Sequence, residues 1–266
     1  MADRDKFAIL HGAQRIWAVA AIHGESERLR TLHHRLGPAL APGDRLVYLG
    51  NYLGHGVSVR ETVDELVRFR RWFLARPWTR LCELAYLRGA QEEMWHKLLQ
   101  LQFATDPRQI LTWMLGHGME ATLAAYGGSG ERGMAAARDG AVAITRWTNQ
   151  LRASVKAAPG HDPFLAGLRR AAYTADGRLL FVHAGIDTSR PLTTQSDSLW
   201  WGGSRFAEIN AAYGEFVMIV RGFDAQHPGI VTGSFTTTLD AGAGFGGPLL
   251  AGCFDGDGRL VATIEV

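Results

Sequence analysis

The chain has 266 residues, and 47% of them are hydrophobic, which is enough to bury the core of one domain. Its 28 basic and 26 acidic residues nearly cancel to a formal charge of +2, and no run of like charges marks a surface for nucleic acid or lipid. We therefore expect neither a nucleic-acid partner nor a membrane partner.

Targeting and membrane-spanning segments are not expected. No long apolar core follows the first six residues, and no later run approaches the roughly 20 apolar residues that cross a bilayer. The two cysteines, Cys82 and Cys253, lie within apolar runs and lack the spacing of a metal site. This usage predicts buried free thiols in a reducing compartment, and so a soluble, cytoplasmic protein.

The first predicted strand covers residues 15–22 and stops at His23-Gly24. A helix with leucines at helical spacing follows it, and Gly37-Pro38 is expected to end that helix. The adjacent His33 and His34 point in different directions on a helix, so we expect both to be exposed to solvent.

Two further strands are predicted, over residues 45–49 and 80–87, with a helix over residues 57–74 between them. The apolar side chains of this helix recur at roughly 100° per residue, and Trp72 falls outside the face they form. Trp72 is therefore a candidate contact for a partner, with packing under a neighbouring loop as the alternative.

Residues from about 95 to 170 are rich in helix-forming segments and lack the strand alternation of the flanking regions. The glycine cluster at 127–130 follows no strand and lacks Gly-Lys-Ser/Thr, so it predicts a joint between helices and not a phosphate-binding loop. Strands are expected within 177–186 and 216–224, and a hairpin around 256–258 closes the chain.

The segments after the strands resemble the motifs of the phosphoprotein phosphatase (calcineurin-like) family of dinuclear metallophosphoesterases. Residues 20–24 read Ala-Ala-Ile-His-Gly for Gly-Asp-Ile-His-Gly, and residues 50–56 read Gly-Asn-Tyr-Leu-Gly-His-Gly for Gly-Asp-Tyr-Val-Asp-Arg-Gly. Residues 88–94 read Arg-Gly-Ala-Gln-Glu-Glu-Met for Arg-Gly-Asn-His-Glu-Glu-Met, and residues 181–186 match the family's Phe-Val-His-Ala-Gly-Ile unchanged. Residues 113–127 resemble an element of the bacterial branch, which includes serine/threonine phosphatases and symmetrical dinucleoside tetraphosphatases.

This resemblance runs from about residue 15 to the C-terminus and implies a fold. The fold is an α/β arrangement in which two sheets pack face to face and helices cover the outside. It implies one metallophosphoesterase-like domain over residues 1–266, with a helical insertion of about residues 95–170 over the cleft.

The resemblance also implies where the two metals would be held, and most of those positions are replaced. At the positions of the family's metal-binding Asp, Asp, Asn and last His stand Ala21, Asn51, Ala90 and Phe223. The two ligand positions that keep the family residue are His23 and His183.

The positions that would bind phosphate and transfer protons are replaced as well. His55 and Gly202 occupy the positions of the family's two phosphate-binding arginines. Gly54 occupies the position of the Asp that orients the general acid, and Gln91 occupies the position of the general acid itself. Arg88 is retained, and with Gly89 and Glu92 it can be kept for a salt bridge and a turn alone.

Without their carboxylates, the two metal positions cannot offset about four positive charges. We therefore expect no metal cofactor and no intact catalytic residue. The leading hypothesis is a pseudophosphatase that acts by binding a protein partner or a ligand. In that case His23 and His183 remain because they pack and form hydrogen bonds at strand ends.

Two alternatives stay open. The first is an active protein phosphatase or dinucleoside polyphosphate hydrolase with a rearranged, mononuclear site that uses Mn or Fe. Its metal would be held by His23, Asn51 and His183, with His55 and Gln91 also lining the cleft. The second alternative is a subunit of a larger assembly, which the eight tryptophans suggest.

Overall fold

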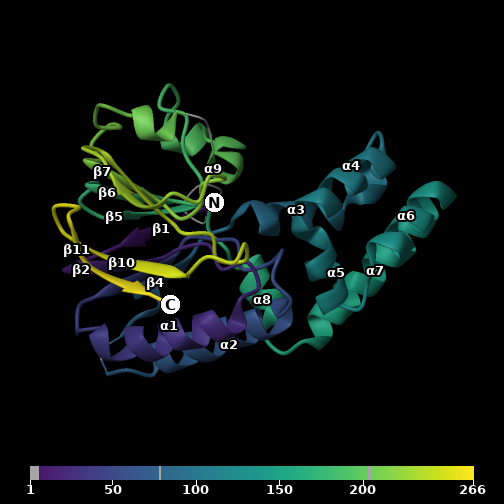
Figure 1. Cartoon of the computed structure of the whole chain (residues 1–266), viewed down its shortest axis with the longest axis horizontal. Coiled ribbons are helices and arrows are strands. Elements are labelled where there is room, and N and C mark those ends of the chain that lie inside the picture. Colours follow the sequence, from purple (N-terminus) through teal and green to yellow (C-terminus); the bar gives the residue numbers. More distant parts are fainter. Residues whose placement is uncertain (1–5, 78, 203–204) are drawn as a thin grey trace.

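Two β-sheets packed face to face form the centre of the protein, and helices cover their outer faces (Figure 1). The computed structural model describes residues 6–77, 79–202 and 205–266. The first five residues, for which no targeting segment is expected, therefore lie outside the described part of the chain.

The five-stranded sheet has the order β11 (Leu260–Glu265), β10 (Leu250–Asp255), β2 (Arg15–Val19), β3 (Arg45–Tyr48) and β4 (Leu84–Tyr86). Strands β2, β3 and β4 are parallel, and β10 and β11 form the expected C-terminal hairpin. Every residue of β3 is buried, because the second sheet covers one face and helices cover the other.

The six-stranded sheet has the order β1 (Phe7–Leu10), β5 (Ala171–Thr174), β6 (Leu179–Val182), β7 (Met218–Arg221), β9 (Thr236–Asp240) and β8 (Gly229–Thr232). Strands β6, β7 and β9 are parallel, so their carboxyl ends meet at one edge. The aromatic rings of Phe181 and Phe254 lie 6.1 Å apart between the sheets and belong to one continuous apolar core.

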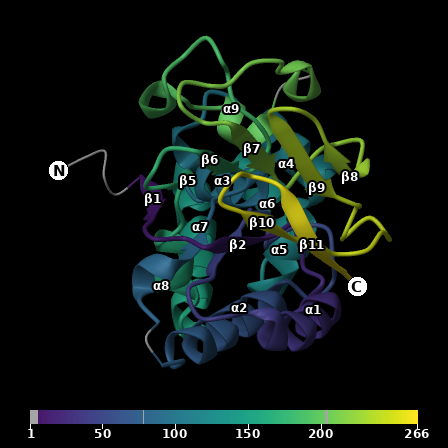
Figure 2. The same cartoon turned by 90° about the vertical axis from the view of Figure 1, so that its left-hand side faces the viewer.

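Helices α1 (Ser26–Ala39) and α2 (Val59–Leu74) lie along the outer face of the five-stranded sheet, and the short α9 (Ser198–Trp201) lies on the side of the six-stranded sheet (Figures 1 and 2). The face of α2 that the sequence predicts is confirmed, since Val59, Val63, Leu66 and Phe73 are buried. Trp72 lies outside that face, with 42% of its surface exposed.

His33 of α1 is buried, so the prediction that it is exposed is wrong; His34 is exposed as expected. The His33 ring stacks on Phe69, with ring centroids 3.8 Å apart. Its Nδ1 lies 2.5 Å from Glu65 Oε1 and its Nε2 lies 2.7 Å from the Tyr48 hydroxyl. Two polar partners offset the cost of burying the imidazole, and the sequence pattern of α1 contains neither of them.

The helical insertion leaves the sandwich at one end and returns to it (Figure 1). It comprises α3 (Ala90–Leu98), α4 (Pro107–Met114), α5 (Glu120–Ala125), α6 (Gly130–Asp139), α7 (Ala141–Ala157) and α8 (His161–Ala166). Between α4 and α5, residues Leu115–Met119 form a π-type turn with a kink at His117 and Gly118. Apolar side chains of α4, α5 and α7 join the same core as the sheets.

Several boundaries differ from the sequence predictions. The first strand, expected over residues 15–22, ends at Val19. Helix α1 continues through Pro38, which is exposed and lies in the last turn of the helix. Helix α2 begins at Val59, and Val57 is fully exposed. The strand expected over residues 80–87 is limited to β4, because the turn Leu81–Glu83 precedes it and leaves Cys82 exposed.

Cys253 is buried as expected, so only one of the two thiols fits the prediction. Within the described ranges, no helix combines the length and the apolar character that crossing a bilayer requires.

Candidate functional site

The loops that follow β2, β3, β6 and β7 meet where the two sheets face each other. Backbone hydrogen bonds join them: His23 N–H donates to the Asn51 carbonyl over 2.7 Å, and Gly222 N–H donates to the His183 carbonyl over 3.0 Å. The Ala21 N–H donates to the Gly222 carbonyl, also over 3.0 Å, and this bond connects the two sheets. The carboxyl ends of parallel strands are the usual place for a site, and the fold brings the replaced motif positions together there.

The Asn51 side chain occupies the position of the family's bridging aspartate, and both ends of its amide are engaged. Its Oδ1 accepts a hydrogen bond of 2.9 Å from the Gln91 backbone N–H. Because a backbone N–H can only donate, Oδ1 must face Gln91, and the Nδ2 group therefore faces His23 Nε2 at 3.2 Å. Asn51 is 1% exposed.

The Asn51 amide fixes the protonation of His23. Since the Asn51 Nδ2 group donates, His23 Nε2 must accept, and the ring is neutral with its proton on Nδ1. Burial lowers the pKa of His23 well below its usual value, and the nearby rings of His55, His183 and His227 lower that pKa further. His23 Nε2 faces the bridging position, and its lone pair already accepts the hydrogen bond from the Asn51 amide.

His183 presents a different nitrogen to the cleft. Its Nδ1 donates to the Leu49 carbonyl over 2.7 Å, which leaves the lone pair on Nε2. Nε2 is buried without a hydrogen-bond partner among the described residues. Burial lowers the pKa of His183 to about 4, against the opposing effect of the Leu49 carbonyl, so the ring is neutral at pH 7.

Aromatic rings fill the space between the two histidines. The ring of Phe223 stacks on His183 with centroids 5.4 Å apart and lies 5.7 Å from His23. Phe245 covers the other side, with its centroid 5.2 Å from His23, 4.3 Å from His55 and 4.4 Å from the ring of His227. The cleft between the two surviving ligand positions is thus lined by phenyl and imidazole rings.

Gly54, His55 and Gln91 stand at charged positions of the family and hold the insertion in place. Gly54 N–H donates to Thr122 Oγ1 over 3.0 Å, and His55 N–H donates to the Gly118 carbonyl over 3.3 Å. Gln91 Nε2 donates to the carbonyl of His117 over 2.8 Å. A Cβ atom on Gly54 would lie 2.3 Å from the Gln91 side chain, so the two positions compete for one space.

The retained Glu92 has a structural role. Its carboxylate accepts four backbone N–H groups, at distances of 2.8 to 3.0 Å: those of Asn51, Tyr52, Leu53 and Gly89. These bonds fix the loop after β3 against the start of α3. Arg88 forms its ion pair with Glu93, at 3.2 Å, and a salt bridge and a turn thus account for this motif, as the sequence allowed.

The side chains in the cleft do not fit a pair of divalent metals. The methyl groups of Ala21 and Ala90 and the ring of Phe223 offer no donor atom, and the Asn51 oxygen already binds a backbone N–H. In the described ranges, no three His, Cys, Asp or Glu side chains form a group that could hold a metal ion. Hard divalent ions require charged oxygen ligands, and these positions supply none.

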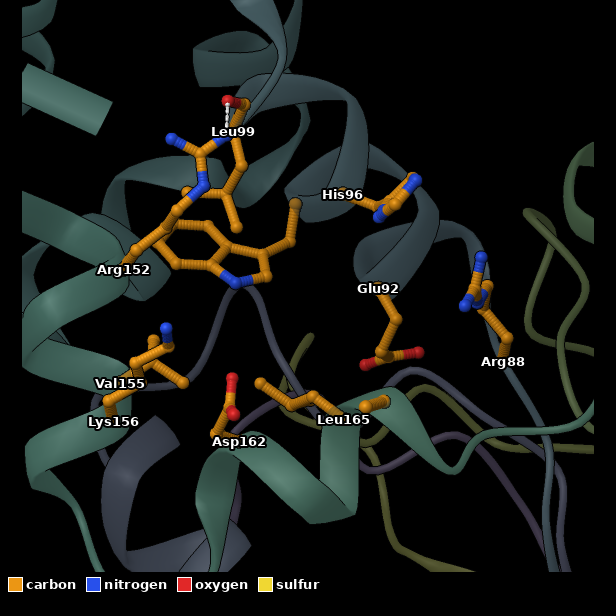
Figure 3. Close-up of a pocket in the computed structure, with 11 residues that line it drawn as sticks. Arg88, Glu92, His96, Leu99, Arg152, Val155, Lys156, Asp162 and Leu165 are labelled. Atoms are coloured by element: carbon orange, nitrogen blue, oxygen red, sulfur yellow. Dashed lines mark hydrogen bonds between the residues drawn. The ribbon is translucent and has the colours of Figure 1, made fainter. Parts of the chain in front are cut away.

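A separate pocket of about 400 Å³ lies on the far side of Glu92, between α3, α7 and α8. Figure 3 shows Glu92 pointing into it beside Arg88, with Arg152 bonded to the Leu99 carbonyl and Lys156 opposite Asp162. None of the replaced motif positions lines this pocket, so it is distinct from the cleft.

Sequence reasoning missed two residues of the cleft, His227 and Phe245. His227 Nδ1 lies 2.9 Å from Asp240 Oδ2, and Asp240 also accepts the N–H groups of Asp224 and Gly242. A Gln-His-Pro segment and a phenylalanine among glycines carry no motif, so the sequence offers no signal for either residue. Only the tertiary structure brings their side chains to the cleft.

Comparisons with known proteins bear on the fold. No family model matches the sequence, and no curated protein matches it. Among solved structures, a protein named as a diadenosine tetraphosphatase is 18% identical, with a TM-score of 0.58 over 98% of this chain and 97% of its own.

Two further structures match. The cold-active protein-tyrosine phosphatase of a psychrophilic Shewanella species is 12% identical (TM-score 0.52; 100% and 85% of the two chains). A protein serine/threonine phosphatase from Saccharomyces cerevisiae, similar to human PP5, is 12% identical (TM-score 0.51; 97% and 82%). The chain has the fold of calcineurin-like phosphoesterases, as the motif resemblance implies.

Proposed function

We propose that the protein is a catalytically impaired metallophosphoesterase homologue that acts by binding a partner or ligand. The observation that carries this proposal is the Asn51 amide, which occupies the bridging position and uses both the Gln91 N–H and the His23 lone pair. A metal at that place would have to break both hydrogen bonds and would gain no negative charge in return.

The rest of the cleft supports the same conclusion. The family's mechanism needs charged groups to hold phosphate and to donate a proton, whereas the Gln91 amide donates to the His117 carbonyl and the His55 ring packs against Phe245. Phe223 and Phe245 place apolar rings where two metals and a phosphate would need polar surroundings. A bacterial, cytoplasmic origin remains a prediction of the sequence.

Hydrolysis and metal content test the proposal together. The protein is purified without chelators, its metal content is measured by mass spectrometry, and p-nitrophenyl phosphate and diadenosine tetraphosphate are tested with added Mn²⁺. We expect no stoichiometric metal and no turnover above buffer. Robust Mn²⁺-dependent turnover by the natural protein would refute the proposal.

Restoring the family residues provides the positive control. The variant with Ala21→Asp, Asn51→Asp, Ala90→Asn, Gln91→His and Phe223→His regains the carboxylates and imidazoles of both positions, and we expect it to bind Mn²⁺. Metal uptake by this variant would show that the natural protein lacks metal because its ligands are replaced and not because the cleft is unfolded.

One observation favours the alternative of an active enzyme with a mononuclear site. The His183 Nε2 lone pair is buried without a hydrogen-bond partner among the described residues, so it could ligate one Mn or Fe ion. A bound metal at one equivalent that is lost in His183→Gln supports this alternative. Metal-free protein contradicts it.

A further inference from the structure

The pocket between α3, α7 and α8 (Figure 3) is lined by several charged side chains that already have partners within the protein. Arg88 pairs with Glu93 at 3.2 Å, and Arg152 donates to the Leu99 carbonyl. The Glu92 carboxylate accepts four backbone N–H groups, which occupy all of its lone pairs. We therefore assign these three charged groups to the protein's own structure and not to a ligand.

Two opposite charges at the same pocket have no such partner. Lys156 of α7 and Asp162 of α8 lie opposite each other (Figure 3), and neither forms a hydrogen bond or an ion pair with any described residue. The Trp95 indole N–H likewise has no acceptor in the described part of the chain, although only 4% of Trp95 is exposed. His96, in contrast, is engaged, because its Nε2 lies 2.8 Å from the Gln100 amide. The pocket thus offers one cation, one anion and one indole N–H donor.

Apolar side chains form much of the remaining lining, among them Leu99, Val155 and Leu165. The Trp95 ring packs on Tyr126 with centroids 5.6 Å apart, so its position is set before a ligand arrives and little entropy is lost on binding. The volume of about 400 Å³ lies near the lower end of the range for small-molecule pockets. A fitting occupant is therefore small, partly apolar and charged.

We infer that this pocket binds a free α-amino acid with a large apolar side chain. The carboxylate of the amino acid would accept hydrogen bonds from the Lys156 ammonium and the Trp95 indole N–H, and its ammonium would donate to the Asp162 carboxylate. Its side chain would lie against the apolar lining, where burial of apolar surface favours binding.

A ligand with a single charge fits this pocket less well. An anion would pair with Lys156 and be repelled by Asp162, and an amine would pair with Asp162 and be repelled by Lys156. An α-amino acid carries both charges on one carbon and so matches both side chains at once. The pocket is distinct from the cleft, so this inference goes beyond the proposed function and holds whether or not the cleft is catalytic.

Isothermal titration calorimetry of the full chain with free amino acids tests the inference. We expect at least one of L-leucine, L-phenylalanine and L-tryptophan to bind with a Kd of about 1 mM or tighter, and glycine, which lacks a side chain, to bind at least about tenfold more weakly. The tightest of the three is then compared with its N-acetyl derivative, which lacks the ammonium, and with its amide, which lacks the carboxylate. Each derivative should bind at least about tenfold more weakly, since each loses a charge-assisted hydrogen bond.

Two substitutions assign each charge of the ligand to its side chain. Lys156→Gln should remove the difference in affinity between the amino acid and its amide, and Asp162→Asn should remove the difference between the amino acid and its N-acetyl derivative. Lys97→Gln in α3 and Asp139→Asn in α6 change exposed residues outside the pocket and should bind like the natural protein. Thermal midpoints establish that all four variants are folded.

Three outcomes would overturn the inference. The first is no binding of any of the three amino acids at about 1 mM, and the second is equal affinity for the amino acid and either derivative. The third is unchanged binding by both Lys156→Gln and Asp162→Asn. Because these titrations contain neither metal nor phosphoester, a negative result leaves the proposed function standing, and Mn²⁺-dependent turnover in the cleft would leave this inference standing.

Discussion

Asn51 carries an N–H group where aspartate has a second oxygen, and this single difference determines the state of His23. The amide donates to His23 Nε2 and so requires a neutral ring. The backbone φ angles of Asn51 and His23 are positive, 54° and 51°, and lie in the left-handed region, which asparagine and histidine adopt more often than most residues.

Asn51→Asp should raise the pKa of His23. The new carboxylate keeps the hydrogen bond from the Gln91 N–H and turns an anionic oxygen toward the His23 ring, and a nearby opposite charge favours the protonated imidazole. Titration of the His23 ring by nuclear magnetic resonance measures the change. An unchanged His23 titration would show that residue 51 does not control the ring.

Glu92→Gln should destabilise the protein by about 2 kcal/mol, because an amide offers one acceptor oxygen to the four N–H groups that the carboxylate now binds. Urea unfolding measures this loss. Glu131→Gln, at an exposed position of α6, is the control and should unfold like the natural protein. Equal stability of the two variants would contradict the structural role of Glu92.

At the scale of elements, the insertion is held by bonds from the positions that the family uses for chemistry. The loop after β3 and the start of α3 both reach the turn Leu115–Met119, through His55 and Gln91. A turn held in this way should be protected from exchange with solvent as long as both contacts persist.

Gln91→Ala should loosen this turn. The variant removes the donor to the His117 carbonyl, and we expect hydrogen–deuterium exchange to rise over residues 115–119. Exchange over β6 should stay unchanged, since no Gln91 contact involves that strand. If exchange over the turn is the same in both proteins, the Gln91 contact does not hold the insertion.

The sequence predicts most elements because their signals are local or belong to ordered motifs. The buried strands, the apolar face of α2 and the helical insertion follow from periodicity, and the two-sheet arrangement follows from the resemblance. The error at His33 has a tertiary cause, since its two partners lie on β3 and α2. Phe245 could not be predicted for the same reason, because its contacts span residues 23 to 227.

At the scale of the whole molecule, several histidines are buried as neutral rings. The pKa values of His23, His33 and His183 are lowered, first because burial disfavours the charged ring. Such a group adds stability that is complete above the unfolded pKa of 6.5 and is lost as the pH falls toward the folded value. For His183, whose pKa is about 4, this loss amounts to about 3 kcal/mol between pH 6.5 and 4.

The thermal midpoint should therefore fall between pH 7 and pH 5, and His183→Gln should reduce the slope. Calorimetry across this range measures both. His96→Gln changes an exposed histidine of α3 and should keep the natural slope. A midpoint that stays constant down to pH 5 would mean that these rings become protonated inside the folded protein without cost.

The contact between Gly54 and Gln91 constrains the order in which the chain can change. A Cβ atom at residue 54 would lie 2.3 Å from the end of the Gln91 side chain, so this side chain would have to move from the place where it binds the His117 carbonyl. A change at residue 54 alone or at residue 91 alone should thus disturb the contact between the Gln91 amide and the turn Leu115–Met119. The effects of mutations at residues 54 and 91 should therefore not be additive, and a change at one position should be tolerated better when the other changes with it.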